Sequence, residues 1–317
     1  MSGWPLICPA AGVPSHFTGD AGGWGATVRL TKPVKGYPHA GPDDANLSNA
    51  AAFDGLLGVP GAKLRQKIYL QACDDPKVGL KKGLPTTLPA GWVPFAAQGG
   101  TLTISAKPPV SFTPNGDQAF LAFVTALEAQ LGDGYELSLW QEEDQSQFGF
   151  TPATYAAYAG HYTSLFLTAA SSAKLVLNLA LTAPSDGSSE QTVVATIQAC
   201  AKVPWSKLLL DYYCTSWRRG GRIENALAAA DALNLPVGIG ETGAAASNMP
   251  FDRSAWESFC DYLADLFRAR RAAGRDNAQI MYWMGSAASG SGANWLLTDD
   301  EKLPGVLRLA RVATGAS

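Results

Sequence analysis

The chain has 317 residues, an apolar fraction of 47% and a formal net charge of -3 at pH 7. Its length exceeds the usual size of one domain but suits a single α/β barrel. With no basic excess to neutralise phosphates and no apolar run as long as a membrane span, the composition argues against nucleic-acid and membrane partners.

The N-terminal segment, residues 1–22, is rich in Gly, Pro and Ala and lacks periodicity. We expect an N-terminal arm there, available to an assembly partner, followed by one barrel domain over residues 23–317. Because no basic segment precedes an apolar one, we expect no signal peptide. The sequence thus indicates a soluble protein and leaves its location open between cytoplasmic production and a virion or surface assembly.

Apolar runs predict eight strands, at residues 26–30, 66–71, 101–105, 135–140, 174–181, 207–213, 237–241 and 278–284. Helical patterns follow most of them, at residues 43–57, 115–131, 189–201, 223–233, 253–273 and 301–310, with another helix beginning at Thr151-Pro152. Residues 74–94 are interpreted as an insertion with one helical turn. An α/β alternation of this kind predicts a closed (β/α)8 TIM barrel.

The remaining charged residues and cysteines have plainer interpretations. The arginines of residues 268–275 suit the negative end of the helix dipole and are expected to be solvated, and Lys107 is expected in a loop. The five scattered cysteines predict buried free thiols rather than zinc ligands or disulfides. The three histidines lack ligand spacing, so we expect no metal and no cofactor.

Carboxylates stand at the ends of two of the expected strands. Strand 237–241 alternates apolar residues with glycine and ends in Glu241, while strand 135–140 is followed by Gln141-Glu142-Glu143-Asp144. Barrel active sites lie at the C-terminal ends of the strands, and a buried carboxylate is costly unless it is paired or catalytic. Two such carboxylates at one mouth are what glycoside cleavage requires.

Aromatic residues end the neighbouring strands. Trp140, Tyr212, Tyr213 and Trp283 all fall at expected C-terminal strand ends. Aromatic faces stack on sugar rings, so we expect Trp283, Tyr212 or Tyr213, and Trp140 or Gln141, to line the same mouth as Glu241.

These patches together resemble the retaining clan-A glycoside hydrolases, in particular the β-mannanase-type branch, glycoside hydrolase family twenty-six. The resemblance covers about residues 26 to 310 and implies that Glu142 is the acid/base and Glu241 the nucleophile. It implies further that Tyr212 or Tyr213 holds the nucleophile and that Trp283 forms the floor of the sugar site. The implied activity is cleavage of β-glycosidic bonds in a polysaccharide or oligosaccharide by a retaining two-glutamate mechanism.

Two features keep alternatives open. The branch has His before the acid/base, where this chain has Gln141. A bulge at the strand end could place Glu143 in the site instead of Glu142, and we favour Glu142 as the acid/base. The alternative function is a catalytically degraded barrel that binds glycans or serves as a structural module, for example in a phage tail.

Overall fold

The protein is described by a computed structural model that covers residues 24–29, 64–70, 83–140, 149–181, 190–244, 251–275, 277–285 and 302–315. The strands are β1 (Trp24–Arg29), β2 (Leu64–Leu70), β3 (Thr101–Ala106), β4 (Tyr135–Leu139), β5 (Leu175–Leu181), β6 (Lys207–Tyr212), β7 (Val237–Thr242) and β8 (Asn277–Gly285). The helices are α2 (Trp92–Ala97), α3 (Pro114–Leu131), α4 (Pro152–Phe166), α5 (Glu190–Ala199), α6 (Cys214–Arg218), α7 (Glu224–Ala232), α8 (Arg253–Ala272) and α9 (Leu303–Thr314), with a 3-10 turn at Ser172–Lys174.

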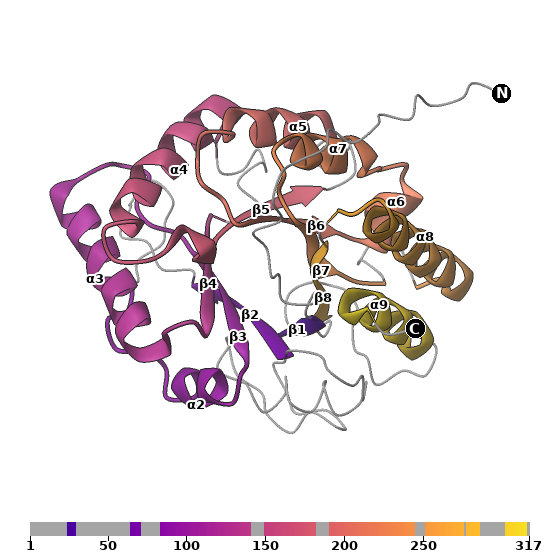
Figure 1. Cartoon of the computed structure of the whole chain (residues 1–317), viewed down its shortest axis with the longest axis horizontal. Coiled ribbons are helices and arrows are strands. Elements are labelled where there is room, and N and C mark those ends of the chain that lie inside the picture. Colours follow the sequence, from indigo (N-terminus) through magenta and orange to yellow (C-terminus); the bar gives the residue numbers. More distant parts are fainter. Residues whose placement is uncertain are drawn as a thin grey trace.

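The strands form a curled, all-parallel sheet surrounded by helices (Figure 1). Each described strand pairs with the next one in the sequence, and β1 also pairs with β8, with Thr27 opposite Trp283, so the hydrogen-bonded ring closes. The predicted α/β class and parallel sheet are therefore confirmed. The helix expected at residues 43–57 and the arm at residues 1–22 lie outside the described residues.

Helix starts follow the capping signals of the sequence. Thr113 accepts a hydrogen bond from the Gly116 amide at 3.2 Å ahead of α3, and Thr151 forms a reciprocal capping box with Thr154 ahead of α4. In both helices proline occupies the first turn, where its missing N–H is not needed. The structure adds α6, a five-residue helix directly after β6 that the sequence analysis did not predict.

The main hydrophobic core lies between the outer face of the strands and the helices. The predicted apolar stripe of α3 is buried there, namely Phe120, Phe123, Val124, Leu127 and Leu131. Three tyrosine hydroxyls of α4 donate to carbonyl oxygens at the ends of β3 and β4: Tyr155 to Leu139 at 2.8 Å, Tyr158 to Pro108 at 2.8 Å and Tyr162 to Pro109 at 2.6 Å. These bonds fix the strand ends against α4, as buried polar groups require partners.

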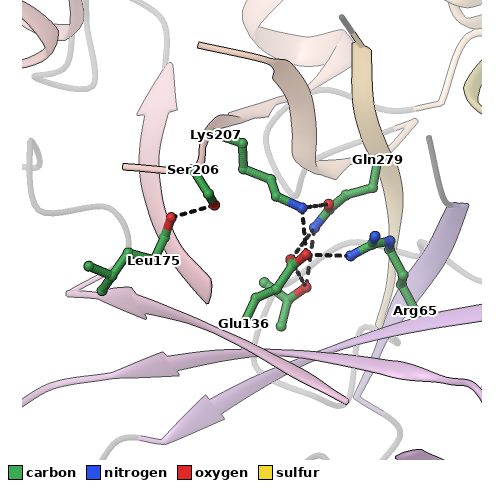
Figure 2. Close-up of polar contacts among 7 residues, drawn as sticks. Arg65, Glu136, Leu175, Ser206, Lys207 and Gln279 are labelled. Atoms are coloured by element: carbon green, nitrogen blue, oxygen red, sulfur yellow. Dashed lines mark hydrogen bonds and ion pairs between the residues drawn. The ribbon is translucent and has the colours of Figure 1, made fainter. Parts of the chain in front are cut away.

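The lower interior of the barrel, near the N-terminal ends of the strands, contains a charged cluster centred on Glu136 (Figure 2). Its carboxylate accepts hydrogen bonds from Arg65 at 2.8 Å, from Lys207 at 2.5 Å and from the Gln279 amide at 3.4 Å. Burial opposes ionisation, but the two cations outweigh it and lower the pKa of Glu136 from 4.5 to about 2. The cluster joins β2, β4, β6 and β8 across the barrel.

Some charged residues are more buried than predicted. Arg270 is buried and pairs with Asp231 at 2.9 Å, so the expectation of a fully solvated helix end is wrong at this position. Lys107 lies in the loop after β3, as predicted, and it is buried, with its ammonium 5.1 Å from the centre of the Trp140 ring. Arg270 lies near the end of α8 and Lys107 just after the end of β3, and a long side chain at such a position can still be buried, which sequence position alone does not reveal.

The cysteines that the structure describes, Cys200, Cys214 and Cys260, are buried free thiols, as predicted. Burial raises the pKa of Cys214 to about 12, so this thiol is neutral at neutral pH. In the described part of the chain, no helix combines the length and the apolar character that a membrane span needs.

Candidate active site

Glu241 lies near the C-terminal end of β7, and a break in strand register determines its direction. Leu210 of β6 pairs with Ile239, but the next residue, Asp211, pairs with Glu241, so Gly240 is an extra residue in β7. Such a bulge lets two consecutive residues oppose one and re-aims the side chain that follows. Glu241 therefore falls on the same face as Asp211, which is the interior face of the barrel.

A tyrosine of the adjacent strand end holds this carboxylate. The Tyr213 hydroxyl donates a short hydrogen bond to Oε2 of Glu241, which is 2% exposed. A hydrogen bond to a charged acceptor is stronger than one between neutral groups and stabilises the ionised form. The pair thus combines a buried carboxylate with a donor aimed at it, at the C-terminal edge of the sheet.

Of the two tyrosines that the sequence left as alternatives, Tyr213 is the one that contacts Glu241. Tyr212 points the opposite way, since successive residues of a strand alternate between faces. Its hydroxyl donates to the Gly221 carbonyl at 2.8 Å and its ring packs 5.5 Å from that of Phe259 in α8. The expectation that Tyr212 contacts a sugar is therefore corrected: it is a core residue.

Trp140 is likewise corrected from a sugar contact to a buried anchor. It is fully buried, its indole N–H donates to the Pro108 carbonyl at 2.9 Å, and its ring packs edge-on against Phe150 at 5.7 Å. A side chain without exposed area offers no stacking face. Its φ of 51° is left-handed, so the chain turns sharply at the end of β4.

The other expected site residues lie outside the described part of the site. Gln141, Glu142, Glu143 and Asp144 lie outside the described residues. Trp283 belongs to β8, but its side chain is not among those described. The structure thus brings together Glu241 and Tyr213 and leaves the acid/base position and the sugar floor as predictions.

Two interior polar residues have no assigned role in the site predicted from the sequence, although Asp211 falls at the expected end of strand 207–213. Asp211 is 1% exposed and occupies the position of β6 that pairs with Glu241, so two buried carboxyl groups lie on adjacent strands. Asn178, on β5, is fully buried. Its signal was present in the sequence, since it is the one polar residue in the apolar run Leu175–Leu181.

The glycines of β7 make room for these neighbours. A Cβ on Gly240 would lie 2.4 Å from Oδ1 of Asp211 and 2.8 Å from Oδ1 of Asn178. A Cβ on Gly238 would lie 2.4 Å from the backbone oxygen of Gln279. Groups of β5, β6 and β8 therefore lie directly against the backbone of β7 at these two glycines.

Among the described residues, no group of three or more His, Cys, Asp or Glu side chains is arranged to hold a metal ion. The chemistry available to the described site is that of a buried carboxylate with a hydroxyl donor. Such a carboxylate can act as a nucleophile or as an electrostatic stabiliser.

Comparison with known proteins gives structural matches alone. No protein-family model matches the chain, and no curated protein does. The catalytic domain of a family-26 endo-β-1,4-mannanase from Bacillus sp. JAMB-750 matches with a TM-score of 0.56 at 14% identity, covering 94% of this chain and 87% of that one.

Two further solved structures match over similar lengths. An endo-β-1,4-mannanase from Thermotoga petrophila gives a TM-score of 0.55 at 10% identity, over 93% of this chain and 78% of that one. A family-30 endoxylanase from Clostridium papyrosolvens C71 gives 0.52 at 13% identity, over 92% and 72%. The fold thus resembles that of clan-A glycoside hydrolases, including family 26, as the sequence motifs implied.

Proposed function

We propose that the protein is a retaining glycoside hydrolase that cleaves β-glycosidic bonds of a polysaccharide. In this proposal Glu241 is the nucleophile, Tyr213 positions it, and Glu142 is the acid/base. The proposal includes a complete (β/α)8 barrel over residues 23–317, preceded by an arm at residues 1–22. The observation that carries the proposal is the Tyr213 hydrogen bond to the buried Glu241 at the C-terminal edge of the sheet.

The proposed mechanism follows from the chemistry of these groups. Glu241 attacks the anomeric carbon while protonated Glu142 gives its proton to the leaving oxygen, which forms a glycosyl-enzyme intermediate. Water deprotonated by Glu142 then releases the sugar with retained configuration. Tyr213 stabilises the charged carboxylate of Glu241 and fixes its direction, which reduces the reorganisation needed in the transition state.

The substrate proposal begins with the structural neighbours. Two of them are named as endo-β-1,4-mannanases and one as an endoxylanase, so β-1,4-mannan and xylan are the first substrates to test. Fold similarity at such identities carries no specificity by itself, because function resides in the site rather than the fold. Gln141, which replaces the usual histidine beside the acid/base, is the residue where we expect specificity or rate to differ.

The experiment is a reducing-sugar assay on a panel of β-linked polysaccharides with the wild type and Glu241→Gln. We expect Glu241→Gln to abolish nearly all turnover while glycan binding remains. The matched control is Glu257→Gln, which makes the same change at an exposed ion pair of α8 and should leave activity unchanged. NMR of the first product should show retention of anomeric configuration.

Other results would redirect the proposal. An active enzyme that tolerates the loss of Glu241 would refute the assignment of the nucleophile. A protein that binds glycans and hydrolyses none would favour the non-catalytic glycan-binding module, and Gln141→His would then be the first variant to test. Comparison of Glu142→Gln with Glu143→Gln decides which carboxyl is the acid, because the acid's loss should harm substrates with poor leaving groups most.

A further inference from the structure

The upper interior of the barrel, between the Glu136 cluster and Glu241, is unusually polar. Barrel interiors are normally filled with layers of bulky branched side chains. Here the separate apolar cluster on the interior face consists of two residues, Val176 and Leu209. The other interior positions of β4 to β7 between Glu136 and Glu241 carry small or polar residues, namely Ser138, Asn178, Ala180, Asp211, Gly238 and Gly240.

Three buried polar atoms in this region have no hydrogen-bond partner within the described structure. They are both side-chain amide atoms of Asn178 and the hydroxyl of Ser138, and both residues are fully buried. Buried polar atoms almost always have a partner, either protein or ordered water, because leaving them unpaired is costly. An asparagine that uses neither amide atom in protein contacts therefore calls for another ligand.

The two residues lie close enough to share that ligand. Ser138 is the register partner of Val176, and Asn178 lies two residues further along β5 on the same interior face. Their Cα atoms are thus roughly 8 Å apart. One or two water molecules between the two side chains would give hydrogen-bond partners to the unpaired atoms of both.

The position of Asp211 favours a bridging water over a direct contact between Asn178 and Asp211. The Oδ1 atoms of Asn178 and Asp211 both lie within 3 Å of the point that a Cβ on Gly240 would occupy. Two acceptor oxygens beside each other gain nothing from direct contact, whereas a water molecule can donate one hydrogen to each. Water in this position would also solvate the buried carboxyl group of Asp211 beside the bulge.

We propose that ordered water is a structural ligand of this barrel, bound by Asn178, Ser138 and Asp211 beneath the β7 bulge that carries Glu241. Polar side chains that bind water would occupy these interior positions in place of the bulky branched side chains of other barrels. Because the site lies below the bulge and involves neither Glu142 nor the sugar, the inference goes beyond the proposed function and stands or falls separately from it.

The first test is a high-resolution crystal structure of the full chain. We expect at least one water molecule within hydrogen-bond distance of the Asn178 amide and the Ser138 hydroxyl. A dry interior, or an Asn178 amide that donates directly to Asp211, overturns the proposal. So does a cation with six or more oxygen ligands at about 2.3–2.6 Å in place of water.

The second test counts long-lived internal waters in solution by magnetic relaxation dispersion of water nuclei. Asn178→Leu keeps the volume and removes both polar atoms, so its count should be at least one lower than that of the wild type. Asn225→Leu changes an exposed asparagine of α7 and should leave the count unchanged. If Asn178→Leu does not fold, Ser138→Ala replaces it, since it removes one polar atom with little change in volume. An unchanged count in the folded variant refutes the inference.

Discussion

Replacing Glu136 by glutamine should destabilise the protein in a pH-dependent way. The change keeps the shape but removes the negative charge that pairs with Arg65 at 2.8 Å and Lys207 at 2.5 Å. Each pKa unit corresponds to about 1.4 kcal/mol, so lowering the pKa of Glu136 from 4.5 to about 2 corresponds to about 3 kcal/mol. Loss of one partner of a buried ion pair typically costs about 3–5 kcal/mol, in agreement with that figure.

The sign of the pH dependence follows from the lowered pKa. The folded protein holds Glu136 ionised below the pH at which the unfolded chain protonates it. Its stabilisation is therefore complete above about pH 4.5 and is lost as the pH falls toward about 2. The difference in unfolding free energy between wild type and Glu136→Gln should thus be about 3 kcal/mol at neutral pH and shrink as the pH falls from about 5 toward 3.

The assay is urea unfolding followed by circular dichroism at a series of pH values. Glu257→Gln is the control, because its partner Arg253 is 59% exposed and a surface pair contributes at most about 1 kcal/mol. A loss at Glu136→Gln below about 1 kcal/mol at neutral pH, or one that stays constant with pH, would refute the reasoning.

Three further predictions concern the candidate site, β7 and α4. Tyr213→Phe should lower kcat by about ten- to a hundredfold on any substrate the enzyme accepts, because a hydrogen bond to a charged group contributes about 1.5–3 kcal/mol. Tyr212→Phe, the control, should change the melting temperature alone. Equal effects of the two variants on kcat would contradict the assignment of Tyr213. Gly238→Ala should destabilise by about 1–3 kcal/mol, because the new Cβ would lie 2.4 Å from a backbone oxygen of β8. In α4, Gly160→Ala meets no atom within 4 Å and should stabilise by up to about 1 kcal/mol in thermal unfolding. If both alanine variants had the same stability, the close packing described at β7 would be wrong.

The strands and longer helices could be predicted because their apolar patterns have a clear period. The prediction for β3 was residues 101–105 and the structure gives Thr101–Ala106, while α3 starts one residue before its predicted bound. Helix α6 was missed because its five residues are too short to show a helical period.

The site was less predictable, because the end of a predicted strand gives the position of a residue along the barrel but not the face to which its side chain points. Tyr212 and Tyr213 are consecutive, and deciding between them requires knowing which face of β6 points inward. The bulge that turns Glu241 inward is a break in register between two strands, which a single sequence does not display. Trp140 is a residue type that often stacks on sugars, but its indole N–H donates to the Pro108 carbonyl in the loop after β3. This is a tertiary contact, which the sequence does not display.

The glycines of β7 also limit how this barrel could be re-engineered. The inner face of β7 lies against groups from β5, β6 and β8. A Cβ at Gly238 would displace the backbone of β8, and a Cβ at Gly240 would displace the side chains of Asp211 and Asn178. Mutational libraries aimed at a new substrate would thus gain nothing from these two positions, although they lie just before the candidate nucleophile. Useful sequence diversity must come from the loops at the mouth of the barrel, and a library should keep glycine at positions 238 and 240.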